Sequence, residues 1–352
     1  MANFDWIEQE QNLTPAALTV RAQAIPVNDQ ALLLWDVLMP RRDVDSVRLR
    51  NITSAIYRPT ADRREWNARG RAIALVTPKL DDIEMTPIES YFKIGEREIQ
   101  ELTERTIGNQ ALFRQIVGAD IPERSDRLAL ANYRRLEVDM TTSWVLGQLT
   151  ARNPIGGDTV TMSFGYDSTR YQTATWTGGT GGNAYANFIA WLQAAQTRVG
   201  PISGVMLRLS TRLAIQQSAP NPFSYNPAVQ MNRQQLQERI QDELGTDFQF
   251  VENERTVMIY PDGGLTPVQT KLWPTGYIAV IPSDGQVGYT GFAPVARAYE
   301  IAGIDADAAI DLRGMTVYRE TANAGRELTV ECQLNALPIP SEQAVYVINT
   351  GI

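Results

Sequence analysis

One long amphipathic segment dominates the pattern of apolar and polar positions along the chain. Within residues 122–149, apolar side chains recur at steps of three or four, the spacing of one face of an α-helix. These side chains are Ala129, Tyr133, Leu136, Met140 and Trp144. Pro122 suits a first helical turn, and Gly147 followed by Asn153-Pro154 marks the end. The pattern predicts a helix roughly 40 Å long, well beyond the usual length of about 11–12 residues.

The polar side of this helix admits two interpretations. Between the apolar positions lie charged side chains that require water or ionic partners: Arg127, Arg134, Arg135, Glu137 and Asp139. Such a helix fits either an ordinary globular domain or a strut that lies across a flat molecule. Taken alone, the segment favours the ordinary domain.

The N-terminal third predicts an arm and a long hairpin. Residues 1–40 contain only short apolar pieces separated by prolines and polar residues, which indicates an extended arm that packs on the rest of the chain or on a neighbouring copy. Residues 44–80 indicate two strands, with 47–57 outgoing and 72–76 returning. The tip, 58–71, is strongly charged and contains Trp66. Because an isolated hairpin is marginally stable in water, it should lie on another molecule or domain, or belong to a larger sheet.

Shorter elements surround the long helix. Residues 94–107 and 110–117 have helical spacing, while 159–164 and 171–176 alternate as a strand pair. Residues 183–198 predict another helix, and 205–281 alternate between strands and helices in the manner of a compact α+β or α/β domain. A second strand pair, 315–321 with 327–334, and a last strand at 344–348 complete the chain. Cys332 falls on the buried face of its strand, as a small apolar side chain.

Composition argues against most kinds of chemistry. The 352 residues include no histidine and one cysteine, which removes zinc sites, internal disulfides and all nucleophile–histidine pairs. The carboxylate clusters at 81–84 and 305–311 lack the pattern of a metal loop. A net charge of −8 argues against a general nucleic-acid binder. No apolar run approaches the roughly 20 residues of a membrane span, and nothing resembles a signal peptide. We therefore expect a non-enzymatic protein without cofactor or metal, made in a reducing cytoplasm.

The order of these parts resembles the major capsid proteins of tailed bacteriophages, which have the Hong Kong 97 fold. More narrowly, the chain looks like the lambda-type family of major capsid protein E. The segments that carry the resemblance are 31–36, Met85-Thr86-Pro87-Ile88, the long helix, 161–165 leading to 175–178, and Glu331-Cys332-Gln333-Leu334 to Pro338-Ile339-Pro340.

The resemblance implies an α+β fold with five parts. Residues 1–43 would form the N-terminal arm and 44–90 the E-loop hairpin. The peripheral domain, or P-domain, would span 91–183 with its spine helix at 122–149. The axial domain, or A-domain, would span 184–312, and 313–352 would return to the P-domain as strands.

The resemblance also implies a function and partners. The chain would self-assemble into hexamers and pentamers of an icosahedral phage shell that encloses double-stranded DNA, with assembly in the bacterial cytoplasm. A portal protein at one vertex, a separate scaffold and a decoration protein would be its partners, and DNA would be bound without specificity. The E-loop tip would contact a neighbouring subunit through Arg63, Arg64, Glu65, Trp66 and Arg69, while Tyr133, Leu136, Met140 and Trp144 would pack the spine helix. An encapsulin-like nanocompartment shell remains the alternative function, and an unrelated soluble enzyme or sugar-binding domain is a third hypothesis.

Overall fold

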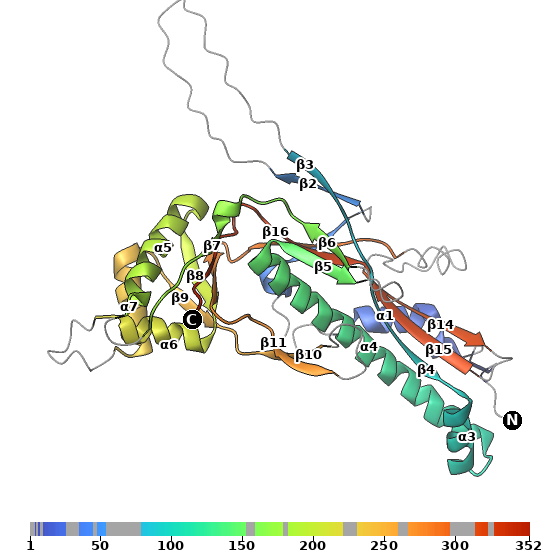
Figure 1. The fold of residues 1–352 in the computed structure, drawn as a ribbon. Coiled ribbons are helices and arrows are strands. Elements are labelled where there is room, and N and C mark those ends of the chain that lie inside the picture. Colours follow the sequence, from blue (N-terminus) through green and yellow to red (C-terminus); the bar gives the residue numbers. More distant parts are fainter. Residues whose placement is uncertain are drawn as a thin grey trace, which may run out of the picture. The chain divides into compact units, whose positions relative to one another are not determined.

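The computed structural model divides the chain into two compact units (Figure 1). Unit 1 comprises Met1–Val47, Met85–Met140 and Tyr289–Pro338, and unit 2 comprises Arg48–Glu84, Thr141–Gly288 and Ile339–Ile352. Within them, the structure describes residues 4, 6–7, 10–25, 35–44, 48–53, 79–152, 159–178, 182–220, 231–259, 267–295, 314–322 and 327–352.

Unit 1 is built on a three-stranded antiparallel sheet with the order β14-β15-β4. The strands are β14 (Met315–Ala322), β15 (Glu327–Leu334) and β4 (Ile88–Ile94). Strict alternation along β15 buries Leu328, Val330, Cys332 and Leu334 on one face. The predicted strand pair at 315–321 and 327–334, and the buried position of Cys332, are therefore confirmed. Strand β4 was missed by the sequence analysis, which assigned 88–90 to the hairpin.

The long helix α4 (Gln110–Leu146) packs on the buried face of this sheet. Asn132, which is 2% exposed, donates to the carbonyl of Cys332 on β15 at 3.0 Å. Ser90 on β4 donates to the carbonyl of Leu128 at 3.4 Å. Helix α3 (Glu96–Arg105) precedes α4, as the spacing of 94–107 predicts.

The predicted start of the long helix, Pro122, is wrong. The helix begins twelve residues earlier, and Asn109 caps it by accepting from the backbone N–H groups of Ala111 and Leu112. Pro122 lies inside the helix, where it removes one backbone hydrogen bond. The buried stripe continues upstream of it through Phe113, Val117 and Ile121, and this packing holds the helix together across the proline.

The sequence predicts an extended arm over residues 1–40, but part of this segment is helical. Residues Pro15–Gln23 form helix α1, with Thr14 as its cap and Pro15 at the first position. It follows the short η2 (Gln11–Leu13), and α2 (Trp35–Leu38) comes later. Thr19 of α1 both donates to the carbonyl and accepts from the N–H of Val317. Helix α1 thereby covers the open edge of β14, which would otherwise be free to pair with another strand.

A second small sheet has the order β1-β13-β16. Strand β1 (Arg41–Asp43) runs parallel to β13 (Gly288–Phe292), and β16 is Ala336–Pro340. The boundary between the two units falls inside β13, after Gly288, and inside β16, after Pro338.

Unit 2 contains a five-stranded sheet with the order β7-β17-β12-β8-β9. The strands are β7 (Tyr171–Thr173), β17 (Val347–Asn349), β12 (Tyr277–Pro282), β8 (Ile202–Leu207) and β9 (Gln249–Glu252). Helices α5 (Ala184–Val199), α6 (Leu209–Ser218) and α7 (Arg233–Leu244) pack with them around an aromatic cluster centred on Phe188. The compact α+β domain predicted for this part of the chain is thus present.

Three antiparallel ribbons complete unit 2. They are β2 (Arg48–Thr53) with β3 (Lys79–Glu84), β5 (Gln148–Arg152) with β6 (Thr159–Ser163), and β10 (Thr256–Ile259) with β11 (Val268–Lys271). The short 3-10 turn η4 (Ser168–Arg170) leads into β7.

Two predicted pairings differ from the structure. Strand β6 pairs with β5 and not with the segment 171–176, because β7 pairs in parallel with β17. The predicted C-terminal return, 313–352, is divided: β14 and β15 belong to unit 1, whereas 339–352 belong to unit 2 and supply β17 to its sheet. In both cases the partners of β7 and β17 are distant in sequence, and local alternation does not encode such pairings.

Candidate functional site

The most distinctive feature of the long helix is its apolar stripe. Tyr133, Leu136, Met140 and Trp144 are all 6% exposed or less. In unit 2 the indole of Trp144 meets the ring of Trp273 edge to face, with centroids 5.3 Å apart and an interplanar angle of 73°. Such a pair adds roughly 0.5–1.5 kcal/mol to the burial of the two rings.

The charged side chains of α4 are held by ionic partners. Arg124 contacts Glu98 of α3 and Asp120 of its own helix, both at 2.6 Å, and lies over the ring of Phe92. Arg127 pairs with Glu123 one turn away. Exposed pairs of this kind contribute about 0.3–0.5 kcal/mol each, so they solubilise the helix more than they stabilise it.

Asp139 of this helix titrates well above the usual range of an aspartate. Its side chain is 15% exposed, and Arg135 approaches it to 2.9 Å. Burial raises the pKa of the Asp139 carboxyl from 3.8 to about 6, although the guanidinium of Arg135 opposes the shift. Between about pH 4 and pH 6 the folded chain therefore keeps a proton on Asp139 that the unfolded chain has released.

This shift predicts a pH dependence of stability. Because the folded state has the higher pKa, the contribution of Asp139 is most favourable below about pH 4 and is lost as the pH rises to about 6. Between pH 4 and pH 6 the unfolding free energy of the parent should fall by up to about 3 kcal/mol through this group, and Asp139→Asn should remove that fall. Urea denaturation of both proteins between pH 4 and 7 measures the difference, and parallel profiles would contradict the assignment.

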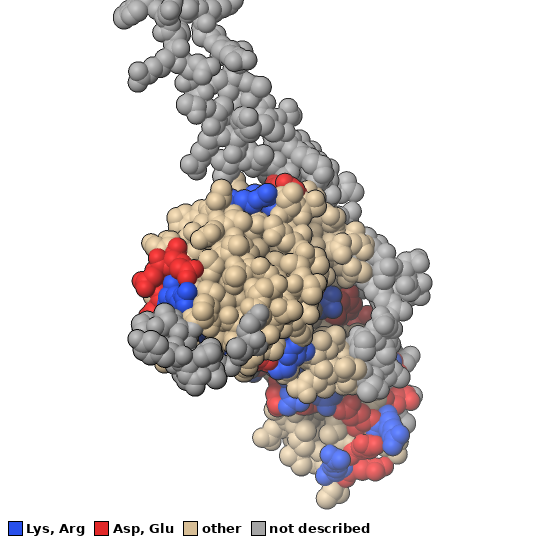
Figure 2. Space-filling model, turned by 60° about the vertical axis from the view of Figure 1, so that its left-hand side comes forward, with Lys and Arg blue, Asp and Glu red and all other residues tan. Residues whose placement is uncertain are grey.

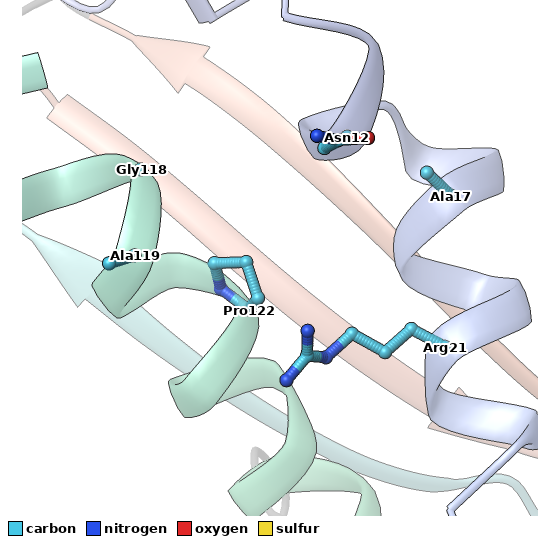
Figure 3. Close-up of a pocket in the computed structure, with 6 residues that line it drawn as sticks. All are labelled: Asn12, Ala17, Arg21, Gly118, Ala119 and Pro122. Atoms are coloured by element: carbon cyan, nitrogen blue, oxygen red, sulfur yellow. The ribbon is translucent and has the colours of Figure 1, made fainter. Parts of the chain in front are cut away.

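A pocket of about 500 Å³ lies between α1 and α4 in unit 1 (Figure 3). Its lining consists of Asn12, Ala17, Arg21, Gly118, Ala119 and Pro122. Arg21 of α1 forms a bidentate salt bridge with Asp126 of α4, with nitrogen–oxygen distances of 2.6–3.1 Å. The side-chain hydrogen bond to Asp126 raises the pKa of Arg21. The sequence analysis found neither this pocket nor this pair, because it placed no helix at Pro15–Gln23 and so brought no partner to Asp126.

The base of the predicted hairpin is present, and its tip lies outside the described residues. Strands β2 and β3 are antiparallel, with Arg48 opposite Glu84 and Thr53 opposite Lys79. The predicted return strand, 72–76, and the predicted contact residues Arg63, Arg64, Glu65, Trp66 and Arg69 fall in the segment that is not described.

The structure offers no candidate for metal or thiol chemistry in the part that it describes. No three His, Cys, Asp or Glu side chains there are close enough together to hold a metal ion. Burial raises the pKa of the Cys332 thiol to about 12, so it is protonated at neutral pH. The described helices also include none with the length and apolar character needed to cross a membrane.

No protein-family model and no curated protein matches the sequence. Solved structures do match. A crystal structure described as a prophage capsid protein from E. coli CFT073 has a TM-score of 0.54 and 9% identity, and the match covers 96% of this chain and 99% of that one. A phage-related protein from Bordetella bronchiseptica RB50 has a TM-score of 0.46 and 12% identity, with 94% and 95% covered. At these identities the first match establishes the fold: the chain has the α+β capsid fold that the sequence predicts.

Proposed function

We propose that the chain is the structural subunit of a closed protein shell, the major capsid protein of a tailed bacteriophage. The observation that carries this proposal is the match in fold, over 96% of the chain, to a protein described as a prophage capsid protein.

The proposal extends to the parts of the subunit. The β2–β3 ribbon is the base of an E-loop that reaches a neighbour through Arg63, Arg64, Glu65, Trp66 and Arg69. The sheet of unit 1 with α4 forms the P-domain and its spine, packed by Tyr133, Leu136, Met140 and Trp144. The five-stranded sheet with α5, α6 and α7 forms the A-domain.

The assembly we infer is an icosahedral shell of hexamers and pentamers around double-stranded DNA, formed in the bacterial cytoplasm. Repeated head-to-tail contacts between identical subunits close into rings when the rotation between neighbours permits it. A portal protein, a separate scaffold and a decoration protein are the further partners. DNA would be enclosed without specific contacts, in keeping with the net charge of −8.

Sedimentation of the purified chain, followed by electron microscopy of each fraction, tests this function. We expect rings or shells of many copies, and particles from infected or lysogenic cells should contain nuclease-protected DNA. Particles that contain a protein cargo and no DNA would identify the encapsulin-like alternative. Only monomers and dimers at every concentration and salt would overturn the shell role and leave the soluble-enzyme or sugar-binding hypothesis.

Deletion of residues 59–70 should separate folding from assembly. The segment is strongly charged and has no apolar core of its own, so its removal should leave the thermal unfolding midpoint within a few degrees of the parent. The same deletion should abolish stable shells in the sedimentation assay, because the contact with the neighbour is lost. Normal assembly of the deleted chain would refute the E-loop assignment.

A further inference from the structure

Helix α7 of unit 2 carries its charges against its own dipole. Arg233 is its first residue, whereas Asp242 and Glu243 lie in its last turn, and the first turn holds no acidic residue. A helix N-terminus has a partial positive charge and a C-terminus a partial negative one. A basic residue at the first position and acidic residues in the last turn therefore interact unfavourably with the helix dipole. The stability of the helix itself therefore does not explain this distribution.

The N-terminal end of α7 belongs to a basic cluster, which we call the basic end. It consists of Arg208, Arg212, Arg233 and Lys271, which surround Glu252 and Glu254. Four cations around two carboxylates leave a net charge of +2. The N-terminus of α6 adds to it, since the N–H of Leu209 donates to Glu254 at 2.9 Å. Arg233 and Lys271 are 53% and 41% exposed, so this charge reaches the surface.

The other end of α7 is acidic, and we call Glu238, Asp242 and Asp247 the acidic end. All three are exposed. Glu238 accepts a hydrogen bond from Gln234, Asp247 accepts one from Gln241, and none of the three has an ion pair among the described residues. The nearby Glu243 is paired with Arg239 at 3.2 Å. On the face shown in Figure 2 most side chains are uncharged, and a group of acidic side chains at the left lies beside a basic one.

Arg233 and Asp242 are too far apart to neutralise each other within one molecule, whereas Glu238 lies midway along the helix. Nine residues separate Arg233 from Asp242, which is about 14 Å along the helix axis. The Debye length at physiological ionic strength is about 8 Å, so surface charges at that separation are largely screened from each other. Each end therefore presents its own charge to a partner in contact with it.

We propose that the two ends are the complementary halves of one contact between copies of this chain, with the basic end of one copy against the acidic end of the next. This inference rests on the proposed shell function and names a surface that serves it. Contact between the same ends of two copies would place like charges together, whereas contact between opposite ends pairs unlike charges. In a ring built from head-to-tail contacts, the second arrangement repeats at every subunit. A nucleic-acid partner would engage only the basic end and would leave the acidic residues of α7 without a role, whereas a second copy of the chain engages both.

Two charge-reversed variants test the contact. The acid-reversed variant carries Glu238→Arg and Asp242→Arg, and the base-reversed variant carries Arg233→Glu and Lys271→Glu. Each places like charges at every contact, so we expect either variant alone to need about tenfold more protein to assemble, which corresponds to about 1.4 kcal/mol per contact. The chain with all four substitutions exchanges the two ends and should assemble like the parent.

Mixing the two variants gives the sharpest outcome. In the acid-reversed variant both ends of the contact are basic, and in the base-reversed variant both are acidic. Copies of the two variants can therefore alternate, and an equimolar mixture should assemble again at the parent concentration. Alternation closes only rings with an even number of subunits, so electron microscopy should find six-membered and not five-membered rings. No restoration in either the mixture or the exchanged chain would overturn the proposal.

Controls separate this contact from folding, from net charge and from the shell function itself. Glu101→Arg with Glu104→Arg on α3 changes the net charge as much as the acid-reversed pair and should assemble normally. Arg233→Gln with Lys271→Gln replaces the base-reversed pair if that chain unfolds early, because Arg233 also donates to the carbonyl of Phe250. If the parent chain never assembles, the shell function is wrong. If the parent and the charge-reversed variants assemble equally well, only this contact is wrong. Loss of DNA binding with unchanged assembly in the base-reversed variant also contradicts it.

Discussion

Trp144→Ala should lower the free energy of unfolding by about 3–5 kcal/mol. The indole is fully buried at the C-terminal end of α4 and meets Trp273 edge to face at 5.3 Å. Removing it leaves a cavity that the neighbouring ring cannot fill, since a long helix and a second tryptophan fix the walls. Urea denaturation at a protein concentration too low for assembly measures the loss.

Trp144→Phe is the matched control for this substitution. The indole nitrogen of Trp144 is buried without a hydrogen-bond partner among the described residues, so phenylalanine forfeits no hydrogen bond there. It keeps an aromatic ring against Trp273, and we expect a loss of about 1–2 kcal/mol. Equal losses for alanine and phenylalanine, or a loss below about 1 kcal/mol for alanine, would contradict the packing of this stripe.

Gly147→Ala should destabilise the chain more than an otherwise equivalent substitution at Gly245. Both glycines end a helix with a positive φ, +65° at Gly147 after α4 and +66° at Gly245 after α7. Each N–H donates to the carbonyl four residues before it. An L-residue in this conformation costs about 1–2 kcal/mol at either position.

The two sites differ in what a side chain would meet. A methyl group at Gly147 would lie 2.6 Å from the hydroxyl oxygen and 2.7 Å from the Cζ atom of Tyr171, whereas at Gly245 nothing lies within 4 Å. We expect about 3 kcal/mol for Gly147→Ala and about 1 kcal/mol for Gly245→Ala, the difference being the cost of forcing a packed tyrosine aside. Thermal and urea unfolding of the two variants side by side measures it. Equal costs would show that Tyr171 yields freely.

Local patterns predicted the long elements well. The stripe through Leu136 and Met140 identified a long helix. The predicted end at residue 149 is three residues too late, because α4 ends at Leu146 before Gly147 and Gln148–Arg152 form β5. The alternation of strands and helices predicted for 205–281 is present and includes α7, whose Asn232 and Gln235 form a reciprocal capping box. In both cases the information lies within a few residues of the chain, so the sequence alone suffices.

What the sequence could not predict depends on distant contacts. Pro122 signals a helix start when it is taken alone, but burial of Phe113 and Ile121 on the same face carries the helix through it. Strand β17 follows a short apolar run without alternation, and only its partners β12 and β7 place it in the sheet of unit 2. The charges at the two ends of α7 are visible in the sequence. The basic cluster beside its first residue is not, because distant segments supply it: Arg208, Arg212 and Lys271 with Glu252 and Glu254.

A cryo-electron microscopy reconstruction of the purified chain tests the proposed shell most directly. We predict a closed shell of many identical subunits, each with a rod of density about 55 Å long for the 37-residue helix α4. Ring contacts should place the N-terminal end of α7 in one copy beside the C-terminal end of α7 in the next. Samples that contain only monomers or dimers at every protein and salt concentration would contradict the shell role outright.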